Sequence, residues 1–190
     1  VAENGIAPYG FGWGACPCNP QLFDSWDNND LRKRATVCDI TDSLEGQIAL
    51  SKNGVPNYTW GYWNMQQETG FWQKKHMTVM VKPNTFLATA LSGVNSGYQL
   101  NNVDDLVLIR YADVLLMGAE LGSSKAQEYY DKVRTRAGLS TRPVNLENIK
   151  EERRCEFAFE GLRYFDLLRW HDAQAAFDKE YLAAHACPRK

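Results

Sequence analysis

The sequence predicts a mainly α fold, in which a helical scaffold at residues 104–190 packs against an irregular, loop-rich aromatic region at residues 1–103 with a few short strands. Residues 1–103 hold five of the six Trp and ten of the 14 Gly but only 15 of the 44 charged residues, which is typical of loops and turns. Apolar residues recur at helical three- and four-residue steps only after residue 104. Because the boundary near Asn101-Asn102 is a change of composition without a flexible linker, we expect one continuous domain.

The first two expected helices are short and closely connected. The first runs from Asp104 or Asp105 to about Leu121 and ends at Gly122. Its expected apolar side lies at residues Leu108, Tyr111, Val114 and Leu115. The second is expected to be capped by Ser123 or Ser124, ends at Gly138, and carries a stripe of Ala126, Tyr129, Val133 and Ala137. The short connection between them predicts an antiparallel helix pair.

A long third helix is expected after Pro143, from an Asn145 cap through Trp170. Its narrow stripe gathers Glu152, Glu156 and Glu160, whose carboxylates repel each other unless cations lie between them. We therefore predict an ion-pair network that binds this helix to its neighbours. Its expected members are Arg110, Asp113, Glu120, Arg153, Glu156, Glu160, Arg163, Asp166 and Arg169.

A catalytic use of these carboxylates is the competing interpretation. Residues four apart on one helix are too close for the acid and base of an inverting glycosidase, and they project along a helix flank instead of into a cleft. A di-iron bundle would need Glu-x-x-His pairs, and the sequence has none. We therefore expect no catalytic residue on this helix.

Composition and cysteine pattern exclude several other classes. A formal net charge of −2 gives no general attraction to nucleic acid or anionic membrane. The spacing of Cys16-Pro17-Cys18 does not fit a zinc or redox motif, so we expect neither a metal site nor a cofactor. A disulfide from Cys16 or Cys18 to Cys38 stays open, although the five cysteines cannot all pair within one chain.

Three segments in the helical part resemble a known family. Residues 110–120 (RYADVLLMGAE), 133–139 (VRTRAGL) and 152–170 resemble, in order, the signature segments of SusD/RagB-like nutrient-uptake lipoproteins of the Bacteroidetes outer membrane. A weaker similarity covers residues 30–37. The resemblance implies tetratricopeptide-like helix pairs and a non-catalytic role. It also implies that an oligosaccharide is bound at the cell surface and passed to a SusC-like TonB-dependent transporter.

The resemblance also predicts that this chain is the C-terminal portion of a longer protein. Family members are held at the outer membrane by a lipidated N-terminal Cys, and we expect membrane association only through such an anchor. Part of the glycan site and of the transporter contact would then lie in other sequence.

Aromatic clusters before residue 104 are the candidate ligand-binding residues. Sugars present apolar C–H faces and hydroxyl groups, which flat aromatic rings and amide side chains can meet. The candidates in the denser cluster are Trp60, Tyr62, Trp63, Asn64 and Trp72, and those in a second, weaker cluster are Tyr9 and Trp13. The alternative for each aromatic residue is burial in the core.

Two other function classes remain open. Helix pairs of this kind also form helical-repeat adaptors that bind a protein or peptide, with no sugar involved. A glycoside hydrolase would need an acidic pair on loops, for which Asp24, Asp27 and Asp30 are the only cluster there.

Overall fold

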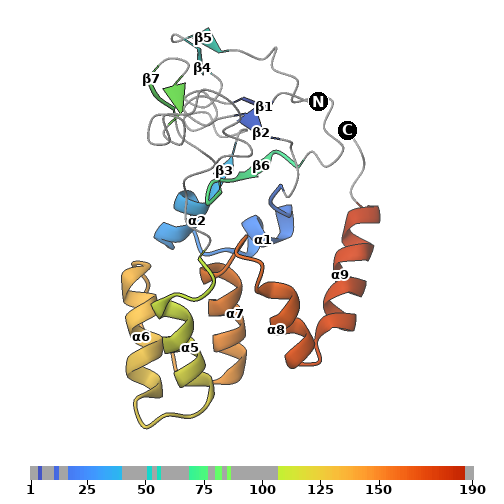
Figure 1. Cartoon of the computed structure of the whole chain (residues 1–190). Coiled ribbons are helices and arrows are strands. Elements are labelled where there is room, and N and C mark those ends of the chain that lie inside the picture. The colour runs from blue at the N-terminus through green and yellow to red at the C-terminus, as the bar shows by residue number, and fades with distance from the viewer. Residues whose placement is uncertain are drawn as a thin grey trace.

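The chain is mainly helical in a computed structural model that describes residues 17–39, 69–76 and 107–186, together with short strands elsewhere (Figure 1). Side chains are described as far as residue 179. The helices are α1 Pro20–Ser25, α2 Leu31–Thr36, α5 Tyr111–Glu120, α6 Ala126–Arg136, α7 Leu146–Glu156, α8 Arg163–Arg169 and α9 Ala173–Ala186. The strands are β1 Asn4–Gly5, β2 Phe11–Gly12, β3 Val37–Asp39, β4 Ser51–Lys52, β5 Val55–Pro56, β6 Phe71–Gln73, β7 Met80–Lys82 and β8 Thr85–Phe86.

Helices α5, α6 and α7 pack side by side around one apolar core (Figure 1). Its most deeply buried members, Leu116 and Tyr130, are fully shielded from solvent. The other buried members are Ala112, Leu115, Ala119, Val133, Ile149 and Phe157. The predicted contact between the first two helices is confirmed, because α5 packs most extensively against α6.

Helix α5 begins later than the sequence predicted. Its first residue is Tyr111, after Arg110 in an extended conformation, so the expected start at Asp104 or Asp105 is wrong. The side chain of Arg110, the N-cap residue, does not cap the helix, because it binds carboxylates of the α7 region. Residues 107–110, the described residues directly before Tyr111, are therefore not helical.

The apolar side predicted for α5 is also largely wrong. Leu108, Tyr111 and Val114 are exposed, and only Leu115 of the predicted set is buried. The helix turns so that Asp113 faces the guanidinium of Arg153, because a buried carboxylate needs a cation. That orientation buries Ala112, Leu116 and Ala119 in place of the predicted residues.

The C-terminal ends of the helix pair agree with the sequence prediction. Gly122 and Gly138 both have positive φ values, 72° and 77°, which favour glycine after a helix. Helix α6 starts at Ala126 with Lys125 as its N-cap and no side-chain capping bond, so the cap expected at Ser123 or Ser124 is wrong. The Ser123 hydroxyl instead accepts from the Lys125 amide, before the helix begins. In the predicted stripe Val133 and Ala137 are buried.

The predicted third helix is two helices. Asn145 caps α7 as expected, with its side chain accepting from the Asn148 amide at 2.8 Å. Helix α7 then ends at Glu156, and Phe159 and Gly161 have φ values of 67° and 77°, which a continuous helix does not allow. Helix α8 begins only at Arg163.

The break has a clear structural consequence. Arg153 and Asp166 are 13 positions apart, which along one straight helix corresponds to about 20 Å. In the structure Arg153 Nε lies 2.8 Å from Asp166 Oδ2. The turn between α7 and α8 therefore folds α8 back so that these two side chains form an ion pair.

A second core joins the N-terminal helices to a small antiparallel sheet. Strand β3 pairs with β6, and Cys38 lies opposite Trp72. The buried members of this core are Cys18, Trp26, Val37 and Ala158. Because Ala158 belongs to the turn after α7, this core connects residues 17–39 and 69–76 to the helical layer.

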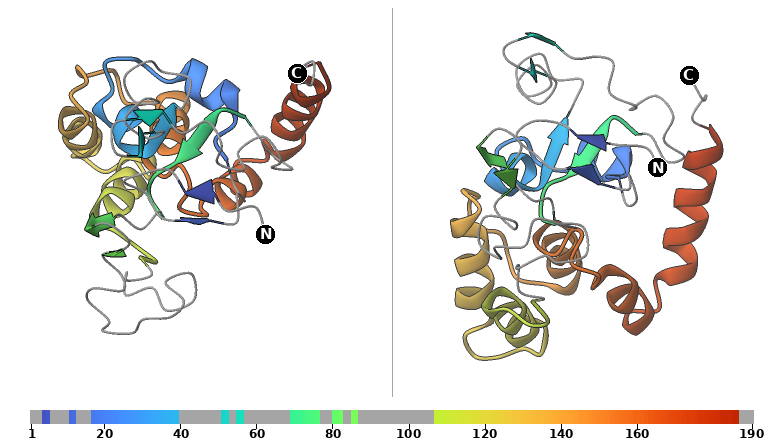
Figure 2. Two further views of the ribbon diagram at one scale, coloured as in Figure 1. Left: turned by 90° about the horizontal axis from the view of Figure 1, so that it is seen from above. Right: turned by 45° about the horizontal axis from the view of Figure 1, so that its top comes forward.

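Helix α9 extends from the end of α8 along one side of the molecule, as both views in Figure 2 show. Within the described residues, no helix combines the length and the apolarity that crossing a bilayer requires. Cys18 is a free, buried thiol, so the Cys18–Cys38 disulfide that the sequence left open is not formed. Cys16, the other candidate partner of Cys38, lies outside the described residues.

Candidate functional site

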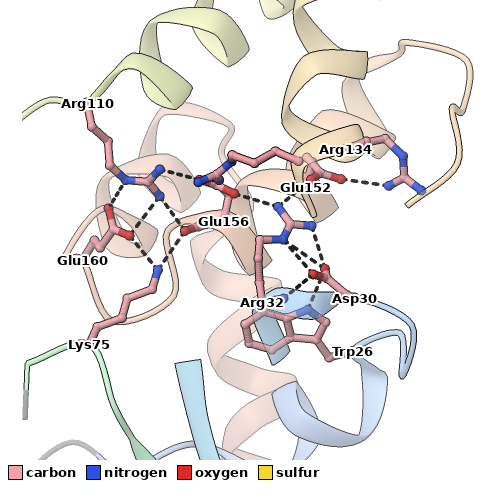
Figure 3. Close-up of polar contacts among 10 residues, drawn as sticks. Trp26, Asp30, Arg32, Lys75, Arg110, Arg134, Glu152, Glu156 and Glu160 are labelled. Carbon is pink, nitrogen blue, oxygen red and sulfur yellow. Dashed lines mark hydrogen bonds and ion pairs between the residues drawn. The ribbon is translucent and has the colours of Figure 1, made fainter. Parts of the chain in front are cut away.

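The most concentrated polar feature of the described residues is a buried set of ion pairs around the end of α7 (Figure 3). At its centre the Glu156 carboxylate accepts hydrogen bonds from three guanidinium groups, those of Arg32, Arg110 and Arg136. The Glu156 side chain is only 1% exposed. One carboxylate therefore ties α2, the start of α5 and the end of α6 to α7.

Glu152, one turn earlier on α7, extends this set on the side of α2 and α6. Its Oε1 accepts from Arg32 Nη1 at 2.6 Å, and its Oε2 accepts from Arg134 Nη1 at 2.9 Å. Arg32 also binds Asp30, the N-cap of its own helix, through Nε and Nη2. The Asp30 carboxylate accepts a further hydrogen bond from Trp26 Nε1 at 2.8 Å.

Glu160 extends the set on the other side, within the turn after α7. Arg110 Nε donates to Glu160 Oε2 at 2.7 Å, and Lys75 Nζ donates to Glu160 Oε1 at 2.6 Å. Figure 3 shows Arg110 and Lys75 converging on this carboxylate from different segments. We call the nine connected residues the glutamate cluster: Asp30, Arg32, Lys75, Arg110, Arg134, Arg136, Glu152, Glu156 and Glu160.

The carboxylates of Glu156 and Glu160 are held in their charged form. Burial by itself would raise the pKa of Glu156, but hydrogen bonds from Arg32 and Arg110 outweigh burial and hold the pKa below its ordinary value. Burial opposes hydrogen bonds from Arg110 and Lys75 in the same way at Glu160, whose pKa is also lowered. A carboxyl group that stays ionised cannot serve as a general acid near neutral pH.

A second set of ion pairs joins α5, α7 and α8, and we call it the aspartate cluster. Arg153 donates to Asp113 Oδ1 at 2.6 Å and to Asp166 Oδ2 at 2.8 Å, and all three residues are buried. Arg169 Nε donates to Asp166 Oδ1 at 2.9 Å. Arg169 also binds Glu120, whose carboxylate accepts from Trp170 Nε1 at 2.7 Å.

The ring of Phe157 lies between the two clusters. The guanidinium carbon of Arg110 lies 4.5 Å from the ring centroid, and that of Arg153 lies 4.8 Å from it. Both distances fit cation–π contacts, which gain strength where the groups are shielded from water. The buried Phe157 ring therefore connects the glutamate cluster to the aspartate cluster.

The structure brings most of the predicted network residues together. Arg110, Glu156 and Glu160 belong to the glutamate cluster. The aspartate cluster contains Asp113, Glu120, Arg153, Asp166 and Arg169. The remaining predicted member, Arg163, begins α8 and is half-buried.

Sequence reasoning missed the cations that come from distant segments. Arg32 and Lys75 reach α7 from 120 and 85 positions away, and Arg134 and Arg136 come from α6. A signal for three of them was present, because Arg32 lies in the segment 30–37, and Arg134 and Arg136 lie in the segment 133–139, both of which carry the family resemblance. No periodicity argument links residues so far apart in sequence.

Most of the candidate ligand contacts lie outside the described residues. These are Tyr9, Trp13, Trp60, Tyr62, Trp63 and Asn64. Trp72 is described: it lies on β6, is only 8% exposed, and faces Cys38 of β3 across the sheet. That burial favours the core interpretation for Trp72, which the sequence left open.

The acidic loop residues do not form a hydrolytic pair. Asp30 is buried, caps α2 and binds Arg32 and Trp26, so its oxygens are occupied by structural contacts. Burial would raise the pKa of Asp30, but these hydrogen bonds hold it below its ordinary value. Asp24 and Asp27 are exposed, and Asp27 accepts the Asn29 amide within its own turn.

Comparison with known proteins gives a consistent set of relatives. The model of the SusD family matches residues 20–187. SusD-like protein P2 of Formosa agariphila is 29% identical in an alignment 180 residues long, which covers 85% of this chain and 32% of that protein. SusD-like protein P25 of the same organism is 35% identical in an alignment 91 residues long, which covers 40% of this chain and 17% of that protein.

Solved structures of surface glycan-binding proteins are similar as well. Surface glycan-binding protein A from Bacteroides thetaiotaomicron in complex with laminarihexaose is 32% identical, with a TM-score of 0.71 over 90% of this chain and 35% of that chain. Its counterpart from Bacteroides fluxus is 28% identical, with a TM-score of 0.61 over 90% of this chain and 33% of that one. The chain thus spans about one third of the length of these relatives.

Proposed function

Because the chain belongs to the SusD family, we propose that it is part of a non-catalytic protein that binds an oligosaccharide at the cell surface. The observation that carries the proposal is the similarity to a surface glycan-binding protein in complex with laminarihexaose. That similarity extends over 90% of this chain, so it includes the cluster-bearing helices and the segments before them.

The described polar groups support a scaffold role for the helices. The carboxylates of both clusters are paired with cations and are buried or half-buried, as in structural ion pairs. Catalysis of glycoside cleavage would need one protonated and one free carboxyl group on either side of a sugar. In our proposal the helices therefore hold the fold, and the glycan is bound by other residues.

We propose that the glycan is bound by the aromatic segments before residue 104. The proposed contacts are Trp60, Tyr62, Trp63 and Asn64, with a second contribution from Tyr9 and Trp13. Rings of this kind stack on the C–H faces of sugars, and Asn64 can both donate to and accept from hydroxyl groups. Because Trp72 is buried, we assign it a structural role and do not include it among the proposed sugar contacts.

The remaining features of the proposal come from the family. Helices α5 and α6 would be one tetratricopeptide-like pair of a longer helical protein, packed against the aromatic region as one domain. The protein would be anchored to the outer membrane by a lipid and would pass its oligosaccharide to a SusC-like TonB-dependent transporter in a nutrient-uptake system. We propose no nucleic-acid partner for this protein.

Single-residue replacements test the binding site. Calorimetry of the full-length protein with laminarihexaose and a panel of other oligosaccharides should give saturable binding. Trp60→Ala and Trp63→Ala should weaken it, while the melting temperature stays close to that of the wild type. Tight binding that is unchanged in both variants would show that the glycan is bound by other residues. Lost binding together with a large drop in melting temperature would assign Trp60 and Trp63 to the core.

An adaptor for a protein or peptide is the second candidate. The exposed side chains of Tyr111, Val114 and Leu121 give α5 an apolar outer face, which such partners use. The two candidates differ in one measurement. A protein that binds no member of the oligosaccharide panel but binds a defined amphipathic peptide, and loses that binding in Val114→Asp, would be an adaptor.

A further inference from the structure

Residues 69–76 are fastened to the scaffold by main-chain and side-chain contacts along their whole length. Strand β6 pairs with β3, and the Phe71 carbonyl accepts from the Cys18 amide at 2.8 Å. The Lys74 amide donates to the Thr36 carbonyl at 2.7 Å. These contacts hold the segment against α2 and β3, and two further residues join it to the helices.

Lys75 is the cation that joins this segment to the glutamate cluster. Its ammonium donates to Glu160 Oε1 at 2.6 Å and to the Glu156 carbonyl at 2.9 Å. Its side chain is 23% exposed, so both hydrogen bonds are partly shielded from water. Charge-assisted hydrogen bonds are stronger than neutral ones, and shielding strengthens them further.

His76 makes the neighbouring contact to the same turn. Its Nε2 lies 2.8 Å from the Phe159 carbonyl oxygen, which can only accept, so Nε2 carries the proton. Phe159 has φ 67°, a left-handed conformation that is unfavourable for a residue with a side chain. The turn between α7 and α8 thus offers two acceptors, the Phe159 carbonyl and the Glu160 carboxylate, to the adjacent residues His76 and Lys75.

In sequence, this fastened segment directly follows the proposed glycan-binding residues. Asn64 is seven positions before Phe71, the first residue of β6. We propose that Lys75 is a positioning residue for glycan binding, which fixes the C-terminal end of the aromatic segment to the turn after α7. The inference rests on the proposed function, because it assigns a role in the same binding site.

Lys75 can be removed without dismantling the cluster. Glu160 keeps both hydrogen bonds from Arg110, and Glu156 keeps Arg32, Arg110 and Arg136. A purely structural cation would contribute only to the overall stability. A positioning residue should instead affect the local order of its segment and the affinity for glycan more than the melting temperature.

The test compares Lys75→Met, which keeps the aliphatic stem and removes the charge, with two controls. Lys132→Met removes a cation from an exposed pair with Glu128, whose side chain is 50% exposed. Lys75→Arg keeps the positive charge at the cluster. Hydrogen exchange of peptides covering residues 55–76, melting temperature and calorimetry with the oligosaccharide panel are measured for each variant of the full-length protein.

Lys75→Met should raise the exchange rate in residues 69–76 by about ten-fold and weaken glycan binding by on the order of ten-fold, because a charge-assisted contact and the preorganisation it gives are lost. Lys132→Met should match the wild type, and Lys75→Arg should recover most of the affinity. Unchanged affinity in Lys75→Met overturns the inference, whatever its exchange rate, and so does weaker binding without faster exchange. Absence of glycan binding by the wild type refutes the proposed function instead, and local exchange alone then decides whether Lys75 fastens the segment.

Discussion

Replacing Glu156 by Gln removes the negative charge at the centre of the glutamate cluster while keeping the size of the side chain. The variant leaves Arg32, Arg110 and Arg136 around an uncharged amide. The amide has one acceptor oxygen, and its NH₂ group must lie near a guanidinium, which is an unfavourable donor–donor contact. We therefore expect Glu156→Gln to destabilise the fold.

The size of the effect depends on which cations lose their partner. Removing one member of a buried ion pair costs about 3–5 kcal/mol. Arg32 keeps Asp30 and Glu152, and Arg110 keeps Glu160, so the loss is shared. The Arg136 side chain is 59% exposed, and water replaces much of its contact. We expect a loss of about 3 kcal/mol, at the lower end of that range.

Equilibrium unfolding in urea at pH 7 measures this loss against a matched control. Glu128→Gln makes the same chemical change in an exposed ion pair with Lys132 and should leave the unfolding midpoint unchanged. A shift of the melting temperature by about 6–12 °C should accompany the loss in Glu156→Gln, from about 2–4 °C per kcal/mol in a chain of this size. If Glu156→Gln unfolds within about 0.5 kcal/mol of the wild type, the cluster is not a structural cross-link.

Three further predictions concern pH, the turn after α7 and the helical core. The pKa values of Glu156 and Glu160 are lowered from 4.5 in the folded protein, so their contribution to stability is present above that pH and is lost as the pH falls below it. The free energy of unfolding should therefore drop on acidification below about pH 4.5, and less steeply in Glu156→Gln. A free energy of unfolding that does not change with pH in this range would contradict the prediction. Gly161 has φ 77° with open space around its Cα, so Gly161→Ala should cost about 1 kcal/mol of stability in thermal unfolding, and Gly161→Asn should cost less. Equal stability of all three proteins would contradict a cost from the left-handed backbone conformation. Leu116→Ala, at a fully buried position, should cost about 2–5 kcal/mol of stability in urea unfolding. Leu121→Ala, at an exposed position, should cost under about 0.5 kcal/mol. Similar losses in the two variants would contradict the packing of α5.

Local sequence signals predicted the helix ends well where chemistry fixes them. Asn145 caps α7 with its side chain, and Gly122 and Gly138 adopt the left-handed conformation that ends α5 and α6. These effects act over three or four residues, so the sequence contains all the information they need. The charged stripe from Glu152 to Glu160 was likewise recognisable as a set of carboxylates that require cations.

The break between α7 and α8 was not predictable from the same signals. Helical spacing continues through Phe157 and Leu162, and only Gly161 interrupts it. What ends α7 is tertiary: Glu160 binds Arg110 and Lys75, and the Phe159 carbonyl accepts from His76. Contacts with residues 50 or more positions away override the local preference for helix.

The orientation of α5 was mispredicted for a related reason. The sequence offered Tyr111 and Val114 as apolar-face residues, but Asp113 is buried and bound to Arg153. A buried carboxylate is so costly without its cation that it directs the helix rotation. A periodicity argument that treats charged residues as exposed selects the wrong face.

Calorimetric titration of the full-length protein with laminarihexaose and other oligosaccharides tests the central claim most directly. We expect heat that saturates with at least one glycan, and no shorter sugars in the calorimeter cell after the titration. No binding across the whole panel, or the appearance of cleavage products, would contradict it.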